Sequence, residues 1–258
     1  MNTMPLPADA RAPSLAGLYL REAGYEFLHQ LRTPMVAVPT LAFPLVFYIL
    51  FGLVLPGKWG NYDRTAYLLA TYGVFGVIGP ALFSFGVGMA LDRANGLLEL
   101  KRVAPMPIGA YFFGKIAMSL IFGLIVVLLL SIAAIGFGGV HIDPLTWVKL
   151  TAVLLLGTLP FCALGLWIGT LVHGQAAVAV VNLVYLPMAV LSGLWMPLFA
   201  FPAVLQKLAV IWPAWHLSQL ALGTIGQLSA VNYGLHVAVL LLTAVLFLSL
   251  AALRLRER

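Results

Sequence analysis

Charged residues are scarce in this sequence. Of its 258 residues, 9% are Asp, Glu, Lys or Arg and 62% are hydrophobic, and the mean hydropathy is +1.05. A soluble domain carries about 25% charged residues, so this chain has too few of them to cover a water-facing surface. The composition therefore excludes an ordinary soluble domain. It predicts an all-α membrane protein that forms one domain over residues 1–258.

Several chemical signatures are missing as well. Cys162, which lies in an apolar run, is the only cysteine, so no intrachain disulfide can form. No Gly-x-x-x-x-Gly-Lys-Ser/Thr sequence occurs, so the chain does not bind ATP through a P-loop. The five histidines lack metal-ligand spacing: His29, His141, His173, His216 and His236. The sequence therefore predicts no catalytic, metal or cofactor site on this chain.

The apolar runs also lack acidic and basic residues at mid-depth. Ion-coupled transporters usually keep carboxylates there, so this absence argues against ion-coupled transport. Asn182 is the only amide in the middle of a run, and it is expected either to bond a neighbouring helix or to contact a substrate. Gly165 and Gly169 form a Gly-x-x-x-Gly pattern, which favours close helix packing within one subunit.

Long hydrophobic runs are what the chain does have. A helix that crosses a bilayer needs about 20 mostly apolar residues. The runs of suitable length predict six spans, over residues 35–55, 66–91, 111–137, 145–172, 176–198 and 233–253.

The cations indicate which way the spans run. With six spans, both termini share one side. That side would carry Arg11, Arg21, Arg32, Arg93, Lys101, Arg102, Lys115, Arg254, Arg256 and Arg258, and the other only Lys58, Arg64, Lys149 and Lys207. The richer side is predicted to be cytoplasmic, with the chain in the plasma (inner) membrane. Because the net charge of +6 is spread over loops and tails, no nucleic-acid partner is expected.

Two further segments are neither spans nor ordinary loops. Residues 14–33 carry an apolar stripe at helical spacing, which predicts an elbow helix lying in the membrane interface; a cytosolic helix is the alternative. Residues 199–227 are too apolar for an open loop and are interrupted by Pro202 and Pro213. We expect a pair of short re-entrant helices there, before the last span.

The loop between the second and third spans concentrates charge. Residues 94–103 can form a short helix that ends before Pro105, with Glu99 and Arg102 paired on it. Such a short charged helix could be the contact for a soluble partner. Alternatively, its cations serve only as anchors on the cytoplasmic side.

The residues of this loop resemble the signature of the type-2 ATP-binding-cassette (ABC) exporter permeases. The matching residues are Arg93, Gly96, Glu99, Leu100, Pro105, Gly114 and Lys115. A second match, LSGLWMPL over residues 191–198, is similar to the family's Ser-Gly-x-x-x-Pro motif at the end of span five. The order of elbow helix, six spans and re-entrant pair also agrees with the family.

The resemblance implies a half-size membrane subunit. Two copies, expected to be identical, would form the translocation pathway in membrane lipid, each with a separate ATPase subunit that carries ATP and Mg. Residues 92–107 would be the cytoplasmic coupling helix. Its expected ATPase contacts are Arg93, Leu97, Glu99, Leu100, Lys101 and Arg102, with Glu22 or Glu26 of the elbow helix as a second contact.

The resemblance also implies that spans two and five line the dimer seam. The expected pathway residues are Phe75, Phe83, Phe85, Asn182, Tyr185, Met188 and Trp195, although any of them could instead face lipid or a neighbouring helix. An uncharged, aromatic lining suits an amphipathic cargo such as a drug, a lipid or a lipid-linked glycan. The alternative functions are an ion-coupled or facilitated carrier and a membrane assembly protein.

Overall fold

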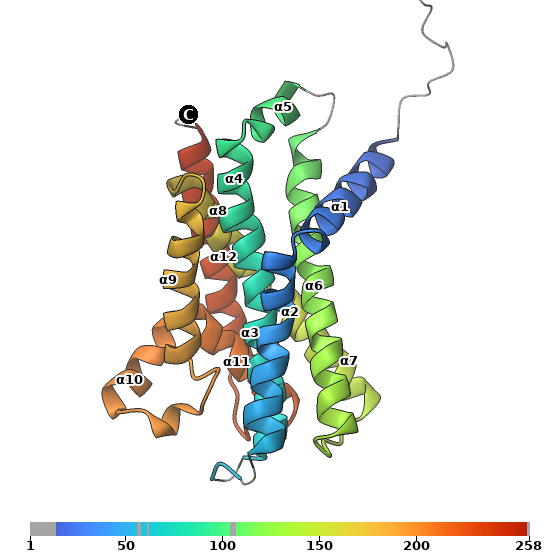
Figure 1. Ribbon diagram of the computed structural model, residues 1–258. Helices are drawn as coiled ribbons and strands as arrows, with labels where there is room; N and C mark the ends of the chain where they lie inside the picture. Colours follow the sequence, from blue (N-terminus) through green and yellow to red (C-terminus); the bar gives the residue numbers. More distant parts are fainter. Residues whose placement is uncertain (1–13, 56–57, 61, 104–106, 257–258) are drawn as a thin grey trace, which may run out of the picture.

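The computed structural model describes residues 14–55, 58–60, 62–103 and 107–256 (Figure 1). Within these ranges the protein is helical and contains no β-strand, only one isolated bridge between Trp59 and Tyr62. The prediction of an all-α fold is therefore confirmed. The helices run side by side as a bundle, and short helices cover both of its ends (Figure 1).

In the part of the chain that the structure describes, five helical stretches are long and apolar enough to cross a membrane. They are α2 (Pro34–Tyr48) with η1 (Ile49–Val54); α3 (Arg64–Leu82) with η2 (Phe83–Gly88) and α4 (Met89–Ala94); α6 (Ile108–Gly136); α7 (Pro144–Leu156) with α8 (Leu159–Leu171); and α12 (Tyr233–Arg256). Both η1 and η2 are π-helical turns that continue the preceding helix. These helices make the chain a multi-pass membrane protein.

The predicted fifth span is shorter than expected. Helix α9 is apolar but covers only Ala176–Leu191, rather than continuing to Leu198. The chain leaves the helix at Ser192, and Gly193 has a φ of +72°, which only glycine adopts without strain. The hydrophobic run in the sequence is therefore longer than the helix that forms from it.

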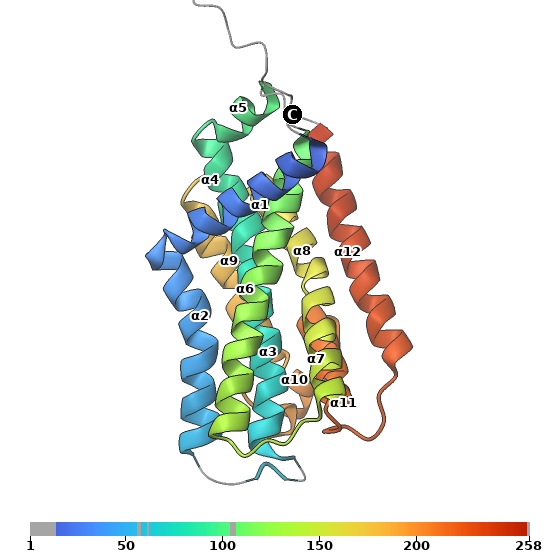
Figure 2. The ribbon, with the colours of Figure 1, turned by 90° about the vertical axis from the view of Figure 1, so that its right-hand side faces the viewer.

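One end of the bundle carries α1 (Leu15–Leu31), α5 (Leu97–Val103) and the C-terminal end of α12 (Figure 1). Ser14 caps the start of α1, since its Oγ accepts a hydrogen bond from the Gly17 amide at 3.2 Å. Helix α1 crosses α6 obliquely (Figure 2). Helix α5 begins three residues later than the predicted 94–103 helix, because Asn95 and Gly96 turn the chain.

The opposite end carries η3 (Leu198–Ala200), α10 (Ala203–Leu208), η4 (Ala209–Ile211) and α11 (Pro213–Thr224). Pro202 precedes α10 and Pro213 opens α11, where a proline has no amide hydrogen to leave unpaired. Helix α11 is buried against α3, α7 and α12. Short helices are therefore present between α9 and α12, and their re-entry into the membrane stays a prediction.

Helix α3 lies at the centre of the bundle and is buried along its whole length. Its continuation η2 packs on α8 at Gly165 and Gly169. A Cβ added at Gly165 would lie 3.1 Å from the Ala81 and Leu82 carbonyl oxygens, and one at Gly169 would lie 2.7 Å from the Phe85 oxygen. The Gly-x-x-x-Gly pattern thus brings two helices of one subunit together, as predicted.

Candidate functional site

Five charged side chains meet where α1, α4, α5 and α6 converge; we call them the charged junction. They are Glu22, Glu26, Asp92, Lys101 and Lys115. Lys101 of α5 forms an ion pair with Glu22 of α1 and lies 3.8 Å from Glu26. Lys115 of α6 pairs with Asp92 at 3.0 Å and with Glu26 at 3.3 Å. The junction therefore links four helices from distant parts of the chain.

The charged junction is largely shielded from solvent. The Lys115 side chain is only 3% exposed, and that of Glu22 is 9% exposed. Tyr111 lies beneath both lysines, with each Nζ within 5 Å of its ring centre, at 4.7 Å for Lys101 and 4.9 Å for Lys115. Its hydroxyl donates to Asp92 Oδ2 at 2.8 Å. Buried charges need such partners, because removal of one leaves the other desolvated and uncompensated.

A glycine allows α1 to reach this position. A Cβ added at Gly114 of α6 would lie 3.1–3.3 Å from Glu22 and Glu26 atoms, including the backbone carbon of Glu22. Any larger residue at position 114 would push α1 away from α6. Gly114 and Lys115 are adjacent in the sequence and act together, because the glycine permits the close approach of the two helices and the lysine neutralises the acids of α1.

Arg93 makes a separate connection. Its guanidinium donates to the carbonyl oxygens of Thr170 at 3.2 Å and Val172 at 2.6 Å, at the end of α8. Carbonyls at a helix C-terminus lack partners within the helix and carry partial negative charge. Arg93 therefore ties α4 to the segment between α8 and α9.

Helix α5 has one face toward the protein and one toward solvent. Leu98 is buried in the core, whereas Glu99 is exposed and Leu100 and Val103 are 64% and 83% exposed. Leu97 is partly exposed. The side chain of Arg102 lies outside the described part of the structure, as do Pro105 and the terminal residues Arg11 and Arg258. The outer face of α5 thus presents an acid beside apolar side chains.

Most of the expected pathway residues form an aromatic cluster between α3 and α9. The rings of Phe75 and Tyr185 stack at 4.8 Å, and Tyr185 also meets Phe83 edge-on at 6.3 Å. Trp195 meets Phe75 edge-on at 5.8 Å. The Tyr185 hydroxyl donates to the Phe75 carbonyl oxygen at 2.8 Å. Four of the expected residues are thus brought together by the fold.

The other three lie differently. Met188 is buried in the core, one turn after Tyr185 on α9. The Asn182 side chain donates to the Val178 oxygen of its own helix at 3.0 Å. Phe85 points away from the aromatic cluster, into a cavity that is also lined by α6, α8 and α12.

Comparison with known proteins places this arrangement in a family. Residues 23–225 match the model of the ABC-2 type transporter family. The chain belongs to that family. The matched region begins within α1 and ends after α11, so it contains α5, the aromatic cluster and every residue of the charged junction except Glu22. The resemblance inferred from the sequence motifs is therefore confirmed.

A curated relative of this ABC-2 transporter chain extends the comparison. It is "Putative transport permease YvfS" of Bacillus subtilis (strain 168), which is 28% identical over 193 residues. The alignment covers 74% of this chain and 78% of the relative. ABC-2 permeases are transport subunits and not catalysts, in agreement with the expectation for this chain.

Several residues of this site were missed by sequence reasoning. Asp92, Tyr111 and Leu98 were not among the expected coupling residues, although all three hold α4, α5 and α6 together. Lys115 was noted as part of a motif and as a cation of the cytoplasmic side. An isolated lysine near the start of an apolar helix was the available signal, because burial of such a group requires an acidic partner.

Proposed function

We propose that this chain and a second, identical copy form the membrane pathway of an ATP-driven exporter. A separate ATPase subunit, which holds ATP and Mg, supplies the energy. The membership in the ABC-2 family and the similarity to a protein named as a transport permease support this proposal. The observation that carries it is that α5 has one face packed on the protein and one face exposed to solvent.

The outer face of α5 suits a contact with a soluble partner. Glu99, Leu100 and Val103 point to solvent, and an exposed leucine and valine at the tip of a membrane protein are costly unless a partner covers them. Leu97, at the edge of this face, and Arg102 would complete the contact. In this proposal the ATPase subunit receives the helix in a surface cleft.

The inner face of α5 would transmit the movement. Lys101 connects α5 to Glu22 and Glu26 of α1, while Arg93 connects α4 to the end of α8. A displacement of α5 would therefore move α1, α4 and α6 as one body, as in other rigid-body transitions. Glu22, Glu26, Arg93 and Lys101 act in this scheme as positioning residues, which hold the helix that the ATPase contacts.

The placement in the membrane follows from the same scheme. We propose one domain over residues 1–258 with six spans, the short α9 being the fifth and α10 with α11 dipping back into the outer leaflet. Helix α1 lies in the cytoplasmic interface, and both termini are cytoplasmic in the plasma membrane. Lys101 and Lys115 lie at the end of the bundle that carries α1, as expected for a cytoplasmic side rich in cations.

The cargo would pass between the two copies along α9, whose packing against α3 forms the aromatic cluster. The aromatic cluster of Phe75, Phe83, Tyr185 and Trp195 lies between these helices, and Leu183 and Leu186 are exposed on α9 toward the proposed second copy. A cluster without charge fits an amphipathic molecule, such as a drug, a lipid or a lipid-linked glycan.

The ATPase activity of the complex tests this function. Leu100→Ala should weaken association with the ATPase subunit by about 1–2 kcal/mol, as for a central interface residue, and lower the stimulation of ATP hydrolysis. Glu99→Ala should act in the same direction. Ile211→Ala, at an equally exposed apolar position at the other end of the bundle, should change neither quantity. If Leu100→Ala and Glu99→Ala both leave association and stimulation unchanged, the proposed coupling role of α5 is wrong.

A further inference from the structure

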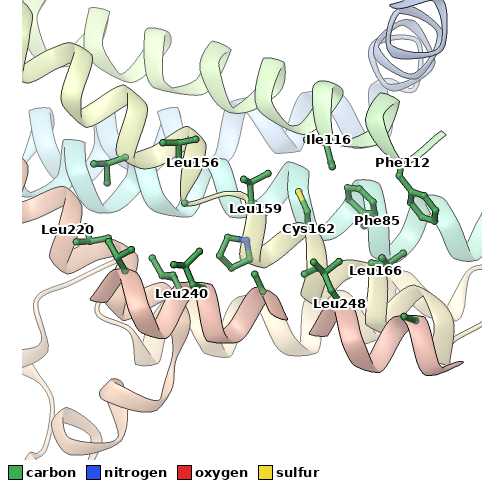
Figure 3. Close-up of a pocket in the computed structure, with 18 of the residues that line it drawn as sticks. Phe85, Phe112, Ile116, Leu156, Leu159, Cys162, Leu166, Leu220, Leu240 and Leu248 are labelled. Atoms are coloured by element: carbon green, nitrogen blue, oxygen red, sulfur yellow. The ribbon is translucent and has the colours of Figure 1, made fainter. Parts of the chain in front are cut away.

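A large cavity is lined by none of the five residues of the charged junction and none of the four of the aromatic cluster. It has a volume of about 930 Å³ and is bounded by α6, α7, α8, α11 and α12. Figure 3 shows Phe112 and Ile116 of α6 on one side, Leu240 and Leu248 of α12 on the other, and Cys162 of α8 between them. Every lining side chain is apolar except for the Cys162 thiol.

The cavity exists because α12 is held on one side only. Helix α12 packs against α8 and α11, and in Figure 2 it stands away from α6. Small residues along the cavity, including Gly157, Ala163, Ala244 and Ala252, leave the space between these helices unfilled. The chain itself therefore does not close this apolar cleft.

The cleft needs an apolar occupant. An empty space of this size would deprive its walls of van der Waals contacts, and water is excluded because the walls offer it no hydrogen-bond partners. In a membrane protein, the available occupants are lipid chains and apolar helices.

The shape of the cleft accommodates an acyl chain. Seven residues of α12 line the cleft at helical spacing, from Val237 to Leu255. Eighteen residues of helix rise about 27 Å. The cleft is therefore long and runs along α12, and its volume of about 930 Å³ is enough for a flexible acyl chain.

The charges at the ends of the cleft select the lipid class. Arg254 and Arg256 lie in the last turn of α12, beside the end of the cleft at Leu255, and both are exposed. The last five residues of the chain carry three arginines and one acid, Glu257. At the opposite end the nearest cation on a lining helix is Lys149, one turn before Val153 of α7. The stronger positive charge therefore lies at the end that carries the two arginines.

We propose that this cleft is a binding site for an anionic phospholipid, with an acyl chain between α6 and α12 and the headgroup at Arg254 and Arg256. The lipid supplies the support that α6 does not give to α12. The site lies outside the proposed cargo pathway, and its occupation does not depend on coupling to an ATPase.

Lipid retention by the purified full-length chain tests the site. After delipidation and addition of phosphatidylglycerol, native mass spectrometry should detect one lipid that stays bound when the others are lost. Ala244→Trp fills the cleft and should abolish this adduct. Val245→Trp adds the same ring on the exposed side of α12 and should keep it. Equal retention by the two variants would overturn the proposal.

The headgroup is tested by competition between phosphatidylglycerol and phosphatidylcholine. Arg254→Gln and Arg256→Gln should each lower the preference for phosphatidylglycerol by about fivefold, the value expected for one cation near an anionic headgroup. Lys149→Gln should leave this preference unchanged. A loss of preference in Lys149→Gln alone, or equal retention of the two lipids by the unaltered chain, would overturn the assignment of the headgroup.

A third measurement uses the unaltered chain and so does not depend on whether a variant folds. Phosphatidylglycerol with a photoreactive group on its acyl chain should cross-link to Ile116 or Leu248 inside the cleft. Cross-links confined to Leu242 and Val245 on the outer face of α12 would indicate only general lipid contact and contradict the proposal. The absence of any cross-link to a residue that lines the cleft would also contradict it.

Discussion

Lys101 of α5 and Glu22 of α1 are 79 residues apart in the sequence and form an ion pair at the end of the bundle. This contact joins the short exposed helix to the helix that precedes the first span. It lies between side chains that are 18% and 9% exposed, so the two charges are only partly screened by water. The pair is therefore expected to influence both stability and coupling.

The Lys101–Glu22 contact predicts non-additive substitutions. Lys101→Met and Glu22→Gln should each destabilise the protein, because each leaves a poorly solvated charge with one partner fewer. The double variant should be less unstable than the sum of the two, by about 0.5–3 kcal/mol. Unfolding of the purified chain in mixed micelles measures the three values. Strict additivity would show that the two side chains do not interact in the membrane-embedded protein.

The crossing of α1 over α6 predicts opposite effects of two similar substitutions. Gly114→Ala places a methyl group against the backbone of α1 and should destabilise the protein by about 1–3 kcal/mol. Gly24→Ala, in the middle of α1, meets no atom within 4 Å and should stabilise it by about 0.5–1 kcal/mol. Thermal unfolding of the two variants compares them directly. A gain of stability in Gly114→Ala would mean that α1 does not lie against α6.

The aromatic cluster predicts a measurable cost for the loss of one hydroxyl. Tyr185→Phe removes the hydrogen bond to the Phe75 carbonyl and should lower the free energy of unfolding by about 0.5–1.5 kcal/mol. Tyr25→Phe, on the exposed side of α1, serves as the control and should have little effect. If the two variants are equally stable, Tyr185 does not bond α3 in the resting protein.

Asp143, at the start of α7, should make the stability of the protein depend on pH. Its carboxylate accepts a hydrogen bond from the Thr146 amide at 2.9 Å, and hydrogen bonds from the backbone hold the pKa of Asp143 below its usual value. Since the folded pKa is lowered, this cap stabilises the protein fully above the unfolded pKa of about 3.9 and is lost as the pH falls through the folded pKa. Asp143→Asn keeps the cap and should remove the contribution of Asp143 to the loss of stability in acid.

Thermal unfolding of the unaltered chain and of Asp143→Asn as a function of pH measures this difference. The two curves should be parallel near neutral pH and diverge only in acid. Curves that remain parallel down to the lowest pH would mean that Asp143 does not cap α7.

Much of the helical layout could be predicted from the sequence, because apolar runs and prolines mark helices locally. Pro213 begins α11, and the glycines of α8 mark its close contact with η2, as their residue types suggested. The end of α9 could not be predicted from hydropathy. Leu194 and Trp195 continue the apolar run, but the backbone has already turned at Gly193.

The site was harder to predict, because its geometry depends on how distant helices cross. The cations of the loop were recognised, but the pairing of Lys101 and Lys115 with acids of α1 follows from the angle of α1 over α6. The separation of Phe83 from Phe85 could have been foreseen. Residues two apart on a helix lie on nearly opposite faces. Phe83 therefore joins the aromatic cluster, and Phe85 faces the cleft between α6 and α12.

The central claim is that α5 contacts an ATPase subunit on the cytoplasmic side. Because Cys162 is the only cysteine, a chain with Cys162→Ser and Glu99→Cys carries one thiol, at the exposed face of α5. In intact cells this thiol should not be labelled by a membrane-impermeant maleimide. In opened membranes it should form a cross-link to the ATP-hydrolysing subunit that co-purifies with the chain. Labelling in intact cells, or the absence of that cross-link in an active complex, would contradict the account.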